Sequence, residues 1–404
     1  MIRFAKQLGI LALGMAMMLG ESFAADKKYD EGATDTDIKI GNTMPYSGPA
    51  SAYAVIGKAQ EAYFRKVNAE GGINGRKISF LSYDDSYSPP KTVEQVRRLV
   101  ESDGVLLMFY PFGTAPNSAI QKYLNSKRVP QLFVAGGATR WGDPKNFPWT
   151  MGWQPSYQSE GKVYARHILA TRPTGKVAVI YQNDDYGKDL LKGLKEGLGD
   201  KASMIVGEEP YETTEPTIDP RIVKLKATGA DIFVSITTPK FSAQAIKKVH
   251  ELSWNPLYIL NNVSASVGAV IKPVGFEAAQ GVISTAYIKD VTDPTWKDDP
   301  AVAQLNKFLD EYMPNVSRTD ANVEYGVLTA QTLVRVLEQC GDDLTRANIM
   351  RQAANLKGVE LGLLLPGITL NTSATNFFPL DQLQLMRFDG EGWKLFGSPM
   401  RGTD

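Results

Sequence analysis

Two periodicities in the placement of hydrophobic residues alternate along the chain. Short runs rich in β-branched and aromatic residues, the first at 37–41, predict strands. Segments in which apolar residues recur every three or four positions predict helices, and the first carries Ala59, Ala62 and Val67 on one face. Further strands are expected at 77–81, 106–109, 132–134, 176–181, 204–206, 232–236 and 257–260. Further helices are expected at 92–100, 117–125, 157–169, 188–198, 221–227, 241–252, 301–312, 323–337 and 346–354. Strands that alternate with helices in this way are typical of parallel α/β sheets.

The series of strands and helices starts again at residue 157. Two successive series of similar length predict two similarly wound lobes rather than one large sheet. About 380 residues follow the N-terminal leader, which is enough for two domains with a core each. A β-rich tail at 382–388 and 393–396 comes after the last helices, and we expect it to fold back onto an earlier lobe.

The N-terminus has the pattern of a secretory signal peptide. Arg3 and Lys6 precede an apolar run at 8–20, and small residues at 22–25 supply a cleavage site. The apolar run is too short to span a bilayer comfortably, which disfavours the alternative of a retained membrane anchor. The only cysteine, Cys340, is far from the cleavage site and has no partner for a disulfide. We therefore expect the first 25 residues to be removed and the mature protein to be exported to the periplasm, not as a lipoprotein.

The charged residues and the known catalytic motifs argue against several function classes. Lys and Arg number 44 against 44 Asp and Glu, with no basic tract, so neither nucleic acid nor an anionic membrane is an expected partner. The two histidines, His167 and His250, lie in helix-like segments without a Cys or His neighbour. No zinc motif, serine elbow or phosphate loop is present. The carboxylate doublets 84–85 and 184–185 follow strands, and we expect them to cap the next turn or helix. The sequence thus predicts no enzyme, no metal and no cofactor.

Three turns that follow predicted strands have the composition of a ligand site. The turns at 46–53, 112–117 and 136–141 combine glycines, hydroxyl side chains and aromatic rings. Glycine allows close approach of the backbone, and hydroxyls with free N–H groups at helix starts suit a carboxylate. Ordinary turn and cap chemistry would explain any one of these turns. Three turns at the same edge of one sheet favour a cleft. The aromatic residues near them are Tyr46, Tyr53, Tyr110, Phe112, Trp141 and Trp153.

The chain resembles the type I periplasmic binding proteins of the branched-chain amino acid (Leu/Ile/Val) receptor family. The segments that carry the resemblance are 40–41 with 47–49, 68–75, 83–85, Pro130, 137–139 and 185–188. The resemblance implies two Rossmann-like lobes joined by three hinge crossovers, which close on a ligand. The first lobe would comprise 36–154 and 287–368, and the second 155–286 and 376–400.

The resemblance also assigns candidate ligand-binding residues. Tyr53 would line the first lobe, the turns at 112–114 and 137–139 would hold a carboxylate, and Tyr186 would close over the ligand. Thr237 and Thr238 lie near the position of a family aromatic, and Trp141 is added from its turn. The complete predicted set is Tyr53, Phe112, Gly113, Thr114, Gly137, Ala138, Thr139, Trp141, Tyr186, Thr237, Thr238 and Asn262.

Two departures from the family pattern bear on the ligand. Pro111 or Phe112 stands where amino acid receptors have a serine, and Asn262 stands where they have an acid that meets the ammonium group. The register of 109–114 against the family stays open. A buried ammonium without a countercharge costs several kcal/mol. We therefore expect a monomeric receptor that captures an aromatic or apolar carboxylate and delivers it to the permease of an ABC importer. The alternatives are a receptor for branched-chain amino acids, amides or urea, or a soluble sensor.

Overall fold

A computed structural model describes residues 27–403, and the predicted signal peptide lies outside these residues. One of its two large sheets has five parallel strands in the order β3-β2-β4-β5-β6. These strands are β2 (Asp37–Met44), β3 (Lys77–Asp84), β4 (Leu107–Phe109), β5 (Gln131–Val134) and β6 (Thr150–Gly152). The helices that connect them are α1 (Ala54–Ala69), α2 (Pro89–Glu101) and α3 (Thr114–Lys127). We call this sheet and the elements packed on it the first lobe.

The second sheet has seven strands in the order β14-β13-β11-β10-β9-β7-β8. Its parallel strands are β7 (Val177–Gln182), β8 (Ile205–Tyr211), β9 (Ile232–Ile236), β10 (Leu257–Leu260) and β11 (Ile283–Ala286). The tail supplies β13 (Gln382–Phe388) and β14 (Trp393–Arg401), which pair antiparallel at the edge next to β11. The helices of this second lobe are α4 (Tyr157–Thr171), α5 (Asp185–Leu198), α6 (Asp219–Ala227), α7 (Pro239–Glu251) and α8 (Lys272–Val274).

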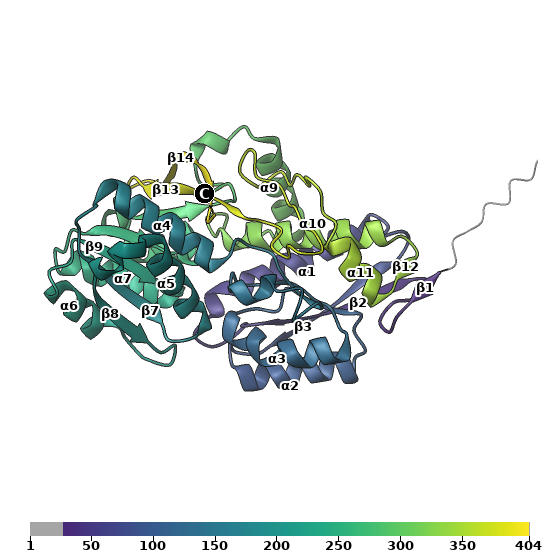
Figure 1. The fold of residues 1–404 in the computed structure, drawn as a ribbon. Helices are drawn as coiled ribbons and strands as arrows, with labels where there is room; N and C mark the ends of the chain where they lie inside the picture. Colours follow the sequence, from purple (N-terminus) through teal and green to yellow (C-terminus); the bar gives the residue numbers. More distant parts are fainter. Residues whose placement is uncertain (1–26, 404) are drawn as a thin grey trace, which may run out of the picture.

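The chain passes between the two lobes three times. The crossings follow β6, follow β11 and precede β13. Between the second and third crossings lie α9 (Pro300–Tyr312), α10 (Asn322–Cys340) and α11 (Arg346–Ala353). Figure 1 shows these helices on the side of α1. Gln60 of α1 donates a hydrogen bond of 3.0 Å to Thr329 of α10, and Gly326 allows the helices to approach, because a Cβ there would lie 2.6 Å from the Cβ of Ala59. Two parallel-rich α/β lobes with three crossovers confirm the predicted fold class, whereas the exact lobe boundaries stay predictions.

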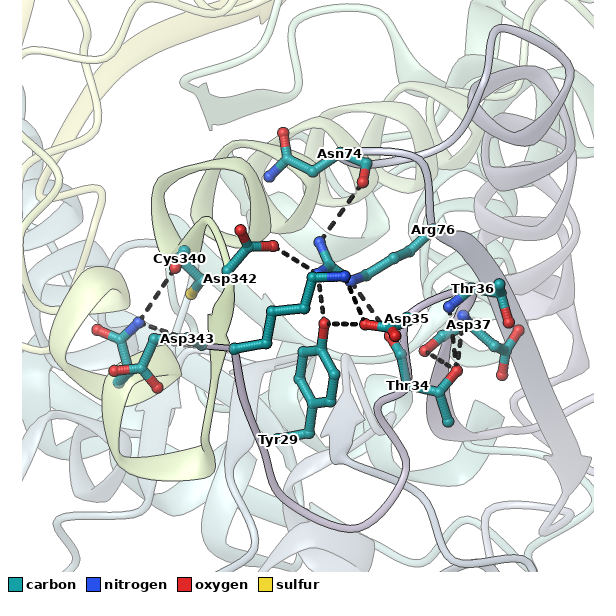
Figure 2. Close-up of polar contacts among 12 residues, drawn as sticks. Tyr29, Thr34, Asp35, Thr36, Asp37, Asn74, Arg76, Cys340, Asp342 and Asp343 are labelled. Carbon is teal, nitrogen blue, oxygen red and sulfur yellow. Dashed lines mark hydrogen bonds and ion pairs between the residues drawn. The ribbon is translucent and has the colours of Figure 1, made fainter. Parts of the chain in front are cut away.

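The N-terminal segment is tied to the end of α10 by a buried guanidinium. Strand β1 (Lys28–Tyr29) pairs in parallel with β12 (Asp343–Leu344). Arg76, whose side chain is 2% exposed, donates bonds of 2.6 Å to both the Tyr29 hydroxyl and the Asp342 carboxylate. Figure 2 shows these bonds converging from three separate segments of the chain. Arg76 therefore holds the N-terminal segment on the first lobe.

Two glycines set the contact between α4 and α5. A Cβ on Gly161 would lie 2.5 Å from backbone atoms of Leu190 and Leu194, and a Cβ on Gly193 would lie 2.3 Å from the carbonyl oxygen of Gln158. The two helices can therefore pack backbone to backbone only because both positions lack a side chain. Within residues 27–403, no helix has the length and hydropathy needed to cross a membrane.

Candidate functional site

A small cavity of about 40 Å³ lies where the carboxyl ends of the two sheets face each other. The first lobe and the first crossing contribute Tyr53, Ile56, Tyr87, Tyr110, Phe112, Gly113, Thr114, Ala135, Gly136 and Gln154. The second lobe contributes Tyr157, Tyr186, Thr238 and Val263, and α10 contributes Asn322 and Tyr325. No lining residue among those that the structure describes is Asp, Glu, Lys, Arg or His. The cavity is therefore uncharged.

Aromatic rings form most of the cavity wall. The rings of Tyr53 and Phe112 lie 4.7 Å apart between centroids, and those of Tyr157 and Tyr186 lie 5.0 Å apart. Burial raises the pKa of Tyr53 and Tyr186 well above the usual value, so both phenols stay neutral hydrogen-bond donors. The Tyr53 hydroxyl donates to the Val263 carbonyl at 2.9 Å, which joins the two lobes across the cavity. Such a wall suits an apolar or aromatic group.

One corner of the cavity is polar and lies at the start of α3. The Thr114 hydroxyl is buried, and its polar neighbour is the Tyr157 hydroxyl. A Cβ on Gly136 would lie 3.2 Å from this oxygen and 3.5 Å from the Tyr157 hydroxyl, so the two hydroxyls face the same glycine. No side chain caps the N-terminus of α3, whose backbone N–H groups carry partial positive charge. This corner can bind an anion such as a carboxylate.

Gly113 fixes the position of that corner. Its φ is +91°, and a Cβ there would lie 2.4 Å from the ring of Tyr87. Both the backbone conformation and the contact require a residue without a side chain. Tyr87 in turn accepts a bond of 3.3 Å from the Gln182 amide of the second lobe. The turn after β4 is thus packed against a residue that also bridges the lobes.

Six of the twelve predicted ligand-binding residues line the cavity: Tyr53, Phe112, Gly113, Thr114, Tyr186 and Thr238. Gly137 and Ala138 lie outside the lining, where the preceding Ala135 and Gly136 take their place. Thr237 lies behind the wall, and its carbonyl oxygen accepts a bond of 3.2 Å from the Tyr186 hydroxyl. The roles of all these residues in ligand binding stay predictions.

Asn262 lies beside the cavity rather than in its lining. Its side-chain oxygen accepts a bond of 2.8 Å from the Tyr325 hydroxyl, and its amide nitrogen donates to the Thr285 carbonyl. Its backbone N–H donates to the buried Glu160 carboxylate at 2.6 Å. Both polar atoms of the Asn262 side chain therefore form hydrogen bonds within the protein.

The turn after β5 places Trp141 and Thr139 outside the cavity lining, although the buried Trp141 Nε1 atom has no hydrogen-bond partner and lies 3.8 Å from where a Cβ on Gly136 would be. Trp141 is fully buried, and Thr139 binds the second lobe, because its backbone N–H and its hydroxyl both donate to Asp189 of α5, at 2.7 and 2.9 Å. Next to it, Arg140 and Asp185 form an ion pair of 3.2 Å. The turn is therefore a contact between the lobes. For Thr139 this favours a role in holding the lobes together over the predicted contact with the carboxylate of a ligand.

Ten lining residues were not among the predicted ligand-binding residues: Ile56, Tyr87, Tyr110, Ala135, Gly136, Gln154, Tyr157, Val263, Asn322 and Tyr325. A signal existed for Tyr87 and Tyr110, because each is an aromatic residue just after a strand. Both have the positive φ typical of a sharp turn, 59° and 51°. No local signal marks Asn322 and Tyr325, which α10 brings in from a distant part of the chain.

Three of the four carboxylates in the two doublets serve as caps, as predicted, whereas Asp185 pairs with Arg140. Asp184 accepts bonds of 3.0 and 3.2 Å from the backbone N–H groups of Tyr186 and Gly187 at the start of α5. Asp84 and Asp85 accept from backbone N–H groups of the turn that follows β3. Burial raises the pKa of both Asp85 and Asp184. Within residues 27–403, no group of three His, Cys, Asp or Glu side chains could hold a metal ion.

Known proteins share both the sequence pattern and the fold. A family model described as periplasmic binding protein matches residues 37–392. The Leu/Ile/Val-binding protein homolog 1 of Brucella abortus (strain 2308) is 24% identical over 333 residues, which are 81% of this chain and 86% of the relative. The crystal structure of a branched chain amino acid ABC transporter from Thermus thermophilus with bound valine has a TM-score of 0.83 at 15% identity. The match covers 91% of this chain and 97% of the Thermus chain. A fatty acid ABC transporter substrate-binding protein from Thermomonospora curvata has a TM-score of 0.77 at 20% identity, with coverage of 93% and 95%. The match over most of its length shows that the chain belongs to the periplasmic binding protein family.

Proposed function

We propose that the protein is a periplasmic receptor that captures a small aromatic or apolar carboxylate between its lobes and delivers it, as a monomer, to the permease of an ABC importer. The observation that carries this proposal is the uncharged aromatic cavity with a single polar corner at Thr114 and Tyr157. It binds its ligand without converting it. The names of the relatives, which include receptors for amino acids and for a fatty acid, support a transport role.

The composition of the cavity wall favours a ligand with one negative charge and no positive charge. The Thr114 hydroxyl and the free N–H groups of α3 can stabilise a carboxylate. An ammonium group would have no carboxylate among the lining residues, at a cost of several kcal/mol. The remaining wall offers rings that pack against an apolar body.

Capture follows from a shift between open and closed forms. A ligand that contacts both lobes binds the closed form better and so increases its population. Tyr53 and Tyr186 line the cavity from opposite lobes, so a ligand between them makes such contacts. The Tyr53 to Val263 hydrogen bond then closes the wall over it.

A thermal-shift screen followed by calorimetry tests the ligand class. We expect benzoate, phenylacetate or 3-phenylpropionate to raise the melting temperature of the mature protein, and leucine, isoleucine and valine to have no effect. Thr114→Val should weaken binding of the acid by about 10- to 100-fold, because a hydrogen bond to a charged group contributes about 1.5–3 kcal/mol. Thr171→Val, at the end of α4, is the matched control and should bind like the wild type.

A second candidate, a branched-chain amino acid receptor, is favoured by the name of the Brucella relative. A strong shift with leucine, isoleucine or valine and none with the aromatic acids would establish it in place of our proposal. Equal affinity of the wild type and Thr114→Val for every acid would show that the polar corner is not the carboxylate site.

A further inference from the structure

A second chamber of about 50 Å³ lies beside the cavity, on the side where the chain crosses between the lobes. Its walls come from the crossing after β11, from β13 and β14, and from the start of α10. The lining residues that the chamber shares with the cavity are Val263, Asn322 and Tyr325. The two spaces therefore adjoin each other at residues that already belong to the proposed ligand site.

The chamber wall has a buried polar atom without a hydrogen-bond partner, the Oδ2 atom of Asp290. The hydroxyl of Tyr287, a residue that is 1% exposed, has the Tyr325 hydroxyl as its polar neighbour. Buried polar atoms are nearly always hydrogen-bonded, so a group from outside the chain is expected to complete Asp290.

The nearby lysine side chains do not supply the missing hydrogen-bond partner, because both are already paired. Lys289 lines the chamber, but its ammonium binds Asp299 at 2.6 Å and the Gly362 carbonyl at 2.7 Å. Lys394 binds Asp293 at 2.9 Å. The Oδ1 atom of Asp290 accepts bonds from the backbone N–H and the hydroxyl of Thr292, which leaves Oδ2 as the acceptor available to a ligand.

The partition between the two spaces is held by contacts of the Tyr325 side chain with Asn262 and Tyr287. The Tyr325 hydroxyl donates to the Asn262 side-chain oxygen at 2.8 Å, and the Tyr325 ring packs edge to face on Tyr287 with centroids 5.9 Å apart. A ligand that displaces the Tyr325 hydroxyl would connect the aromatic cavity with the chamber. Its body would then extend from Thr114 towards Asp290.

We propose that this chamber is a second subsite, which binds a hydrogen-bond donor at the far end of the ligand from its carboxylate. The donor is a hydroxyl or an amide N–H, and Asp290 Oδ2 accepts from it while the Tyr287 hydroxyl provides the second contact. The subsite rests on the proposed function and narrows it, because the preferred ligand then carries an acid at one end and a donor at the other.

Calorimetry with a matched pair of acids tests the subsite. The wild type should bind 3-(4-hydroxyphenyl)propionate about tenfold more tightly than 3-phenylpropionate, which corresponds to about 1.4 kcal/mol. Asp290→Asn replaces the acceptor by an N–H donor and should abolish this preference while affinity for 3-phenylpropionate stays unchanged. Tyr287→Phe, which removes only a hydroxyl, should reduce the tenfold preference to about threefold or less. Asp298→Asn, at an exposed position, is the control.

Phenol separates the subsite from the proposed function, because it carries the donor and no carboxylate. We expect phenol to raise the melting temperature of the wild type and not that of Asp290→Asn. The subsite is refuted if the wild type and both chamber variants respond alike to phenol and to the two acids, including the case in which none of them binds. Binding of phenol that depends on Asp290, without binding of any carboxylate, would support the subsite and refute the proposed function.

Discussion

Glu160 is a buried carboxyl group without a cation beside it, and this makes the stability of the protein depend on pH. It lies on α4, is 3% exposed, and accepts hydrogen bonds from the Asn262 backbone N–H at 2.6 Å and from the Tyr164 hydroxyl at 2.7 Å. Burial disfavours the ionised form and raises the pKa of Glu160 from 4.5 to about 7, although the two hydrogen bonds act in the opposite direction.

The direction of the pH dependence follows from proton uptake. The folded protein holds the Glu160 proton more tightly than the unfolded chain does, so this group contributes stability below pH 4.5. That contribution is lost as the pH rises from 4.5 to about 7. Because one pKa unit corresponds to about 1.4 kcal/mol, ionisation of Glu160 should cost the folded protein about 3 kcal/mol by pH 8.

Glu160→Gln isolates this contribution. A glutamine side-chain oxygen can accept the same two hydrogen bonds, but the side chain does not ionise. We therefore expect the free energy of unfolding of the variant, relative to the wild type, to increase by about 2.5 kcal/mol between pH 5 and pH 8. Urea unfolding followed by tryptophan fluorescence at both pH values measures the difference, and Glu94→Gln, at an exposed position of α2, is the control. A difference between variant and wild type that does not change with pH would refute the reasoning.

Three further substitutions test contacts that hold the fold and the lobes. Asp189→Asn should weaken the contact with Thr139 by about 1 kcal/mol and lower the population of the closed form, which small-angle scattering measures as a larger radius of gyration. Arg76→Met should reduce the free energy of unfolding by about 2 kcal/mol, because Asp342 and its neighbours lose a charged hydrogen-bond donor. Gly161→Ala should cost about 1–3 kcal/mol in denaturant unfolding, since the added methyl group would meet the backbone of α5.

Each of these substitutions has a control of the same chemistry. Asp200→Asn makes the same change at an exposed position and should leave the radius of gyration unchanged. Lys27→Met removes an exposed cation that pairs with Asp35 and should not measurably change stability. Gly392→Ala adds a methyl group where no atom lies within 4 Å. A control that changes as much as its partner would contradict the role assigned to that contact.

The periodic pattern of the sequence predicted the two lobes because buried strands and amphipathic helices are local features. It was less exact at the helix starts. The helix predicted at 117–125 begins at Thr114, and the helix predicted at 188–198 begins at Asp185. In both cases the first turn is set by backbone geometry, by the positive φ of Gly113 and by the Asp184 cap, and not by the apolar positions that reveal the rest of the helix.

The candidate site was predictable only where it is built from turns that directly follow strands. Those turns revealed Thr114 and Phe112 because their composition is unusual for plain loops. Which way a side chain points within such a turn is decided by packing, so Trp141 is fully buried outside the cavity lining and its predicted role in ligand binding stays a prediction. Tyr325 could not be inferred locally, because its position beside Asn262 depends on how α10 packs against the lobes.

The contacts between the lobes explain why a ligand can control closure. The Arg140 and Asp185 side chains are 34% and 58% exposed, and an ion pair this exposed contributes at most about 1 kcal/mol. The contacts of Thr139 with Asp189 and of Tyr53 with Val263 are hydrogen bonds of about 1 kcal/mol each. Each of these contacts is weak by itself, so none of them alone fixes the lobes against each other. A ligand that adds several kcal/mol of contacts to both lobes is then sufficient to make the closed form dominant.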